Sequence, residues 1–208
     1  TMAATLADYA WWSQWRPDWA EAYCVTLISG ITAEAVITSL EAIPTARLRG
    51  IDALYDRDVS DWTGGGESSG ELIGVADIDD GWALIAEING YVGVTERLIE
   101  PMSVGRTVVS HFRNVNAAYR FHWWRDGTLL VDVDLLFPAA RFGADPDALA
   151  EDIRDVGIPL DRPDDIAAVD LSAAGFALAQ RITNVTCTPE LFECSDFLAA
   201  YIRQPGDG

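Results

Sequence analysis

The sequence contains no lysine, and all 14 of its basic residues are arginine. This absence excludes chemistry that needs a lysine amine, such as a Schiff-base nucleophile or the lysine of a phosphate-binding loop. Long apolar runs are also absent, because no stretch approaches the roughly 20 apolar residues of a membrane-spanning helix. The first residues lack the basic and apolar regions of a secretory signal, so we expect a cytoplasmic protein.

Cysteine and histidine are scarce as well. The three cysteines, Cys24, Cys187 and Cys194, form no CxxC motif, and the two histidines are not adjacent. We therefore expect neither a disulfide nor a structural zinc site, and no cofactor. No GxSxG motif, no histidine beside a cysteine and no glycine-rich dinucleotide motif is present, which favours a protein that is not an enzyme.

Acidic residues are abundant. The chain has 33 Asp and Glu against 14 basic residues, a formal net charge of -19. A field this negative repels phosphate backbones, so we expect no nucleic-acid binding. It attracts a basic protein partner and speeds their encounter. The alternative is that the acidic surface serves only solubility.

The length of 208 residues fits a single domain over residues 1–208. Within it we distinguish a tryptophan-rich N-terminal segment, residues 1–20, and a disordered tail, residues 203–208. Trp11, Trp15 and Trp19 recur every four residues, as on one stripe of a helix, but Pro17 argues against an unbroken helix. This segment is either an aromatic docking patch or part of the core.

The pattern of elements predicts an α+β fold with an antiparallel or mixed sheet of about five to six strands, helices on one face and a helical C-terminal third. A strand is expected at 23–28, a helix at 33–41 after Thr32, and a second helix at 47–57. The glycine-rich segment 61–70 predicts a flexible loop. Helices are expected at 146–156 and 166–182, from residue 189, and at 197–202.

Two hairpin systems fill the middle of the chain. Residues 72–78 and 82–88 flank a three-residue turn, which pairs Ile78 with Trp82 and Ile73 with Glu87. A three-stranded meander follows at 107–113, 118–124 and 128–134. We assign it a four-residue loop at 114–117 and a three-residue loop at 125–127. This register puts the apolar residues of the last two strands on one face, whereas a two-residue second loop would bury Asp132 beside Phe121.

This register brings polar residues together on the other face of the meander. It opposes His111 with Arg120 and Arg120 with Asp132. The gathered residues are His111, Arg113, Arg120, His122, Trp124, Asp132 and Asp134. They suggest a binding site in which a histidine acts as acid or base, oriented by Asp132, while the arginines bind an anion. The alternatives are a solvated face held by cross-strand charge pairs and a face that a helix covers.

Two further candidates lie close to these strands. Glu87 stands among apolar residues, so it is either an active-site carboxylate with a raised pKa or a group that pairs with an arginine or fixes the following turn. Asn114 and Asn116 either build their tight connection or project beside Arg113 to bind a ligand.

Three motifs carry a family resemblance: the run Glu87-Ile-Asn-Gly-Tyr-Val-Gly93 after Trp82, the run Phe112-Arg-Asn-Val-Asn-Ala117, and Pro138 followed by Arg141-Phe-Gly143. Over about residues 23–191 the chain resembles an uncharacterised bacterial domain-of-unknown-function family. That resemblance implies no established activity.

Three functions remain open. The first is an acidic interaction domain of inhibitor, immunity or adaptor type that binds a basic protein partner. The second is a small-molecule binding or regulatory domain that uses the His111, Arg120, His122 and Asp132 face. The third is a hydrolase or transferase built on Glu87 or His111.

Overall fold

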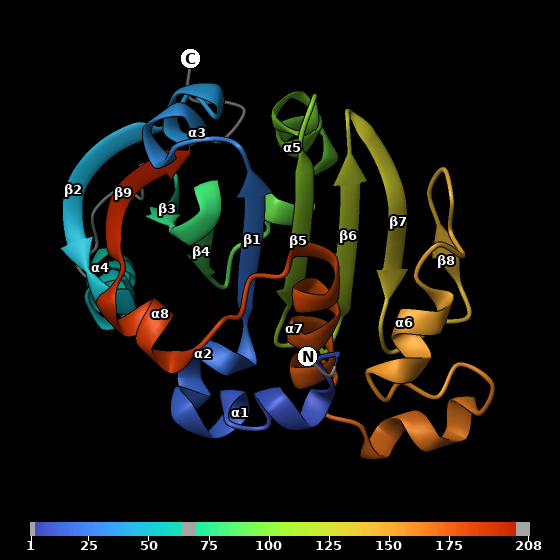
Figure 1. The fold of residues 1–208 in the computed structure, drawn as a ribbon. Helices are drawn as coiled ribbons and strands as arrows, with labels where there is room; N and C mark the ends of the chain where they lie inside the picture. Colours follow the sequence, from blue (N-terminus) through green and yellow to red (C-terminus); the bar gives the residue numbers. More distant parts are fainter. Residues whose placement is uncertain (1–2, 64–69, 203–208) are drawn as a thin grey trace.

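The computed structural model describes residues 3–63 and 70–202. The expected flexible loop falls mostly on residues 64–69 and the expected disordered tail on 203–208, and both stretches lie outside the described residues. Within the described ranges the chain forms one antiparallel sheet of nine strands flanked by helices (Figure 1). The α+β class is confirmed, whereas the expected five to six strands is too low.

The strands are β1 (Tyr23–Ser29), β2 (Ile43–Arg49), β3 (Glu71–Ile78), β4 (Trp82–Ile88), β5 (Thr107–Arg113), β6 (Tyr119–Arg125), β7 (Thr128–Asp134), β8 (Arg141–Phe142) and β9 (Asp196–Ile202). Their order across the sheet is β2-β9-β3-β4-β1-β5-β6-β7-β8. The last strand of the chain therefore lies inside the sheet, between β2 and β3.

The α-helices are α1 (Trp12–Trp15), α2 (Pro17–Glu21), α3 (Ala33–Ser39), α4 (Gly50–Thr63), α5 (Glu96–Ser103), α6 (Ala150–Asp155), α7 (Leu171–Thr183) and α8 (Pro189–Cys194). Short 3-10 turns are η1 (Leu6–Tyr9), η2 (Asp79–Gly81), η3 (Val92–Val94) and η4 (Pro163–Ala168). None of the helices in residues 3–63 and 70–202 combines the length and the apolar composition that crossing a membrane requires.

Helices cover both faces of the sheet, so the expectation of helices on one face is wrong. One core packs α1, α2, α4, α7 and α8 against residues such as Leu84 and Phe121. The other packs α3, α5 and η3 against residues such as Ile85 and Val108. Because neighbouring residues of β4 are buried on opposite faces, this strand reads as a continuous apolar run rather than as an alternating one.

β9 was expected to be a helix, and this expectation is wrong. Its residues Phe197, Ala199 and Ala200 are fully buried between neighbours on both sides. A short apolar run that is buried on all sides shows no hydrophobic periodicity. The sequence alone therefore does not distinguish a buried helix from a central strand. The expected helix at 47–57 is wrong at its start, since residues 43–49 form β2 before α4 begins.

Several local expectations are confirmed. The β3–β4 hairpin pairs Ile78 with Trp82 and Ile73 with Glu87, as its turn length predicted. The Thr32 side chain accepts a hydrogen bond from the Ala35 N–H at 3.2 Å and caps α3. Most of the helix expected at 166–182 is α7, which begins only at Leu171 after its cap Asp170, while residues 166–168 belong to η4.

The tryptophan-rich segment belongs to the core. Trp12 and Trp19 are each 1% exposed, and Trp11 and Trp15 pack against the same cluster as partly buried residues. The Trp12 ring lies 4.4 Å from the ring of Phe176 on α7. The segment is divided into α1 and α2 before Pro17, because proline cannot continue the hydrogen bonding of a preceding turn.

Candidate functional site

The two histidines lie on opposite faces of the sheet. Across β5 and β6 the structure pairs Ser110 with His122 and His111 with Phe121. The expected pairing of His111 with Arg120 is therefore wrong by one residue, and that slip turns His111 and Arg113 away from Arg120, His122 and Asp132. The expected single polar cluster does not form.

The cause is the loop between β5 and β6, which has five residues instead of four. The Asn114 side-chain oxygen accepts hydrogen bonds from the N–H groups of Asn116 and Ala118, at 3.0 and 3.1 Å. Ala117 takes a left-handed conformation, with φ of 58°. Asn114 thus builds the turn by local hydrogen bonding, which was the simpler of the two interpretations.

His111 is a core residue. It is 1% exposed and lies against Tyr23, Phe121 and Phe176, beneath α7. Burial, with a smaller contribution from Arg113, lowers the pKa of His111 to about 3. The imidazole is therefore neutral over the physiological pH range. Arg113 donates to the backbone oxygen of Ala20 at 2.7 Å and so ties β5 to α2.

A smaller polar group remains on the opposite face. The expected cross-strand pairing of Arg120 with Asp132 is wrong, because the register pairs Asp132 with His122 and Arg120 with Asp134. The His122 Nε2 lies 3.2 Å from Asp132 Oδ1, although neither ring nitrogen has an aligned hydrogen bond. Arg120 pairs with the other oxygen of Asp132 at 2.8 Å. Burial raises the pKa of Asp132, but the contact with His122 and the charge of Arg120 outweigh it and hold that pKa below its usual value.

This group is compact and largely closed. His122 is 1% and Trp124 3% exposed, and only Arg120 extends into solvent. Neither of the two cavities described below is lined by these residues. The arrangement matches cross-strand charge pairing beneath covering helices more closely than it matches an open anion site.

Glu87 is completely buried and accepts two backbone hydrogen bonds. Its Oε1 accepts from the Val92 N–H at 2.8 Å and its Oε2 from the Gly93 N–H at 3.1 Å. It therefore fixes the turn that follows β4, as one of the two alternatives expected. Burial, followed by the neighbouring Glu71 carboxylate, raises the pKa of Glu87 to about 8.

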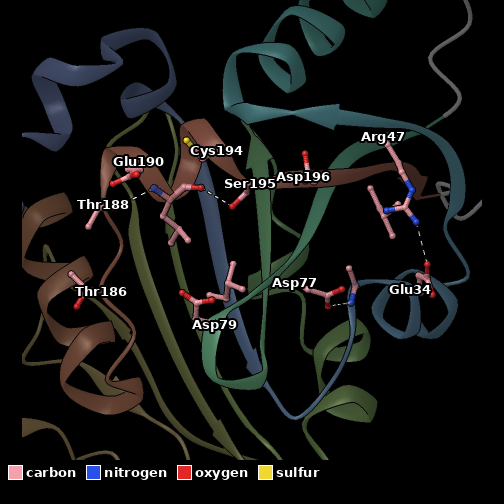
Figure 2. A pocket seen from close by; sticks show the side chains of 14 residues that line it. Glu34, Arg47, Asp77, Asp79, Thr186, Thr188, Glu190, Cys194, Ser195 and Asp196 are labelled. Carbon is pink, nitrogen blue, oxygen red and sulfur yellow. Dashed lines mark hydrogen bonds and ion pairs between the residues drawn. The ribbon is translucent and has the colours of Figure 1, made fainter.

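An acidic groove of about 670 Å³ is the larger of two hollows, the other of which lies between α2 and α4. Its charged lining residues are Glu34, Arg47, Asp77, Asp79, Glu190 and Asp196. Figure 2 shows Glu34 and Arg47 at one end of the groove and Thr186, Thr188 and Glu190 at the other. Five carboxylates thus face one guanidinium, so the groove is strongly negative.

The single arginine of the groove is already engaged. Arg47 pairs with Glu34 at 3.2 Å, and Asp196 pairs with Arg49 at 3.0 Å. The Asp77 carboxylate accepts the Ala33 N–H at 2.7 Å. Within residues 3–63 and 70–202, no ion pair neutralises Asp79 or Glu190, both of which are exposed.

The groove forms where two neighbouring strands separate. β3 and β9 are paired from Glu71 opposite Ile202 to Val75 opposite Leu198. Beyond this pair, β3 continues to Ile78 beside β4, while β9 continues beside β2. The loop before α8 and the first turn of α3 close the two ends. None of the groove residues was a candidate from the sequence; the only available signal was the acidic run around Asp77, Asp79 and Asp80.

A second cavity, of about 220 Å³, lies between α2 and α4. Its arginine, Arg16, is paired with Asp52 at 2.7 Å. In the described ranges, no group of three or more His, Cys, Asp or Glu side chains is arranged to hold a metal ion.

These features define an α+β protein with one antiparallel sheet, buried histidines and an acidic groove at the point where two strands diverge. The chain belongs to a family of unknown function, DUF6461, whose model matches residues 2–206. Membership in a domain-of-unknown-function family, expected from the three motifs, is therefore confirmed. No curated protein and no solved structure matches the chain.

Proposed function

We propose that the protein is an acidic interaction domain, of inhibitor, immunity or adaptor type, that binds a basic segment of a partner protein in the groove between β3 and β9. The observation that carries this proposal is the charge of the groove, where five carboxylates face one arginine that is itself paired.

Asp79 and Glu190 are the groups best suited to a cationic partner. Both are exposed on the groove lining and form no ion pair with an arginine of the described residues, so a guanidinium that reaches them can form charge-assisted hydrogen bonds with both carboxylates. The net charge of -19 adds long-range attraction, which speeds the encounter with a basic partner.

The strand geometry favours an extended segment over a compact ligand. Among the described residues, no strand lies opposite β3 at residues 76–78, on the side where β9 turns away. A strand edge of this kind offers backbone groups to a segment that enters the groove, while the carboxylates select its basic side chains.

Titration with a fluorescein-labelled peptide of alternating arginine and alanine tests the proposal. We expect the double variant Asp79→Asn/Glu190→Gln to weaken binding by about tenfold or more. The matched control, Glu96→Gln/Asp145→Asn, removes the same charge from exposed sites outside the groove. We expect this control to weaken binding by less than about threefold, since distant charges are screened.

Equal weakening in the two double variants would show that the peptide senses only net charge, and would refute the groove as the binding site. Raising the salt from about 50 mM to about 300 mM separates the contributions further, because exposed charge attraction is largely screened there. The difference between the two variants should persist at the higher salt if the contacts in the groove are direct.

A further inference from the structure

Glu71 and Glu87 form a pair of neighbouring carboxyl groups beneath the segment that follows β4. Glu87 lies opposite Ile73, so Glu71 and Glu87 project from adjacent strands on the same face of the sheet. Glu71 Oε1 accepts the Tyr91 N–H at 2.8 Å, next to the two N–H groups that Glu87 accepts. Oε1 of both glutamates lies beside Gly90, and burial together with the charge of Glu71 raises the pKa of Glu87. Three consecutive peptide groups are thus held by two acids.

The backbone of the segment lies directly on the carboxyl oxygens. A Cβ atom at Gly90 would collide with Oε1 of Glu87 and would lie 2.6 Å from Oε1 of Glu71. Only glycine permits this approach. The next residue but one, Val92, is fully buried in the core that α3 and α5 share, so the position of the segment is coupled to the packing of α5.

Two carboxyl groups that are buried next to each other resist ionising together, because the second charge is both desolvated and repelled by the first. The groups that face the pair offer no compensating positive charge. Cys24 on β1 contacts Glu87, and burial followed by Glu87 raises the pKa of this thiol, which keeps it neutral. Asp58 on α4 lies near enough to Glu71 for the two charges to repel each other, so this neighbour is also acidic. The segment itself contributes only backbone N–H groups, and among the described residues no arginine or histidine pairs with either glutamate.

We propose that Glu71 and Glu87 act as a pH-sensitive latch, which holds residues 90–94 and the start of α5 on the sheet while the pair shares one proton and loosens them when both carboxyls ionise. The N–H groups of Tyr91, Val92 and Gly93 already donate hydrogen bonds to the pair while it holds one proton. Ionisation therefore adds a second negative charge in a buried place without adding a donor to stabilise it.

The direction of the pH dependence follows from the raised pKa. Burial and Glu71 raise the pKa of Glu87 from 4.5 to about 8. Between these two values the folded chain holds a proton that the unfolded chain releases. The free energy of unfolding therefore falls as the pH rises through this window, and the latch itself loosens near its upper end.

Titration of the backbone amide resonances by NMR, over about pH 5.5 to about 10 on the full chain, tests the latch. We expect the Val92 and Gly93 amides to titrate together with a midpoint near 8, and their protection from exchange to fall about tenfold or more above it, after correction for the intrinsic pH dependence. In Glu71→Gln the side-chain amide donates to Glu87 and its oxygen still accepts from Tyr91. The midpoint should then fall by at least about one pH unit, a tenfold loss of proton affinity.

Glu96→Gln is the matched control, because it removes one exposed carboxylate at the start of α5 and should leave the midpoint unchanged. If Glu71→Gln does not fold, Glu87→Gln serves instead, and its Val92 and Gly93 amides should not titrate. The latch is wrong if the wild-type amides do not titrate near 8, if their protection stays constant through the midpoint, or if Glu71→Gln keeps the wild-type midpoint.

Discussion

His111 and His122 lie on neighbouring strands, yet their side chains point to opposite faces of the sheet. His111 is enclosed by aromatic rings beneath α7, whereas His122 stands beside a carboxylate in the other layer. The chain therefore has two separate histidine environments, and substitutions at each should have different consequences.

Asp132→Asn should destabilise the fold by about 1–3 kcal/mol at neutral pH, because it removes the carboxylate that contacts the buried His122 and pairs with Arg120. The pKa of Asp132 is lowered in the folded chain. Its contribution is thus fully present above its usual pKa of 3.8 and is lost as the pH falls through the lower folded value. Urea unfolding at neutral pH and at about pH 3 should show this difference shrinking at the lower pH. Asp145→Asn, at an exposed site, should change stability little at either pH.

Gly175→Ala should destabilise the protein, although alanine normally favours a helix over glycine by about 1 kcal/mol. A Cβ atom at this position of α7 would collide with the imidazole of His111. We expect a net cost of about 1–3 kcal/mol in denaturant unfolding, as for other overpacked sites. The double variant with His111→Ala should recover part of this cost, since the new methyl group then has space. Additive effects would mean that α7 does not rest on His111.

Trp12→Ala should cost about 3–5 kcal/mol, the range for deleting a large buried aromatic side chain. Trp12 is 1% exposed and its ring contacts Trp19, Tyr23 and Phe176. Trp62, which is 79% exposed on α4, provides the control. Trp62→Ala should change the free energy of unfolding by less than about 0.5 kcal/mol, as measured by circular dichroism in urea. Similar effects at both positions would contradict the placement of the N-terminal segment in the core.

The parts of the fold that were predictable are those fixed by local chemistry. The three-residue turn 79–81, with Asp80 and Gly81 at positive φ, set the register of β3 and β4. The same reasoning from turn residues gave the wrong register at the β5–β6 loop. Ala117 adopts a left-handed conformation there, which an alanine side chain does not signal. The three-residue loop expected at 125–127 is also wrong, because Arg125 pairs with Thr128 across a two-residue turn. A bulge between Trp123 and Trp124 adds a residue to β7 that alternation alone does not place.

The groove could not be predicted from the sequence because it depends on the order of the strands in the sheet. Its walls come from segments as distant as Glu34, Asp79 and Glu190, and they meet because β9 inserts between β2 and β3. Once β9 is taken for a helix, nothing in the sequence brings these segments together. Glu87 was recognisable because a carboxylate in an apolar strand must be satisfied, but its partner Glu71 became apparent only with the sheet register.

Cys194 offers a direct reporter on the groove. It is exposed and lies on the groove lining, whereas Cys24 and Cys187 are buried. Burial raises the pKa of Cys187 to about 12 and holds that of Cys24 well above its usual value, so both remain thiols that react slowly. A thiol-specific reagent should therefore modify one cysteine in the native protein and three after denaturation, and Cys194→Ser should abolish the native reaction.

The same reagent reports occupancy of the groove. A saturating arginine–alanine peptide should slow modification of Cys194 by about threefold or more, because a bound segment covers this part of the lining. The protection should be lost in Asp79→Asn/Glu190→Gln at the same peptide concentration and kept in Glu96→Gln/Asp145→Asn. If the peptide binds the wild-type protein but leaves the rate at Cys194 unchanged, it binds elsewhere on the acidic surface, and the assignment of the groove fails.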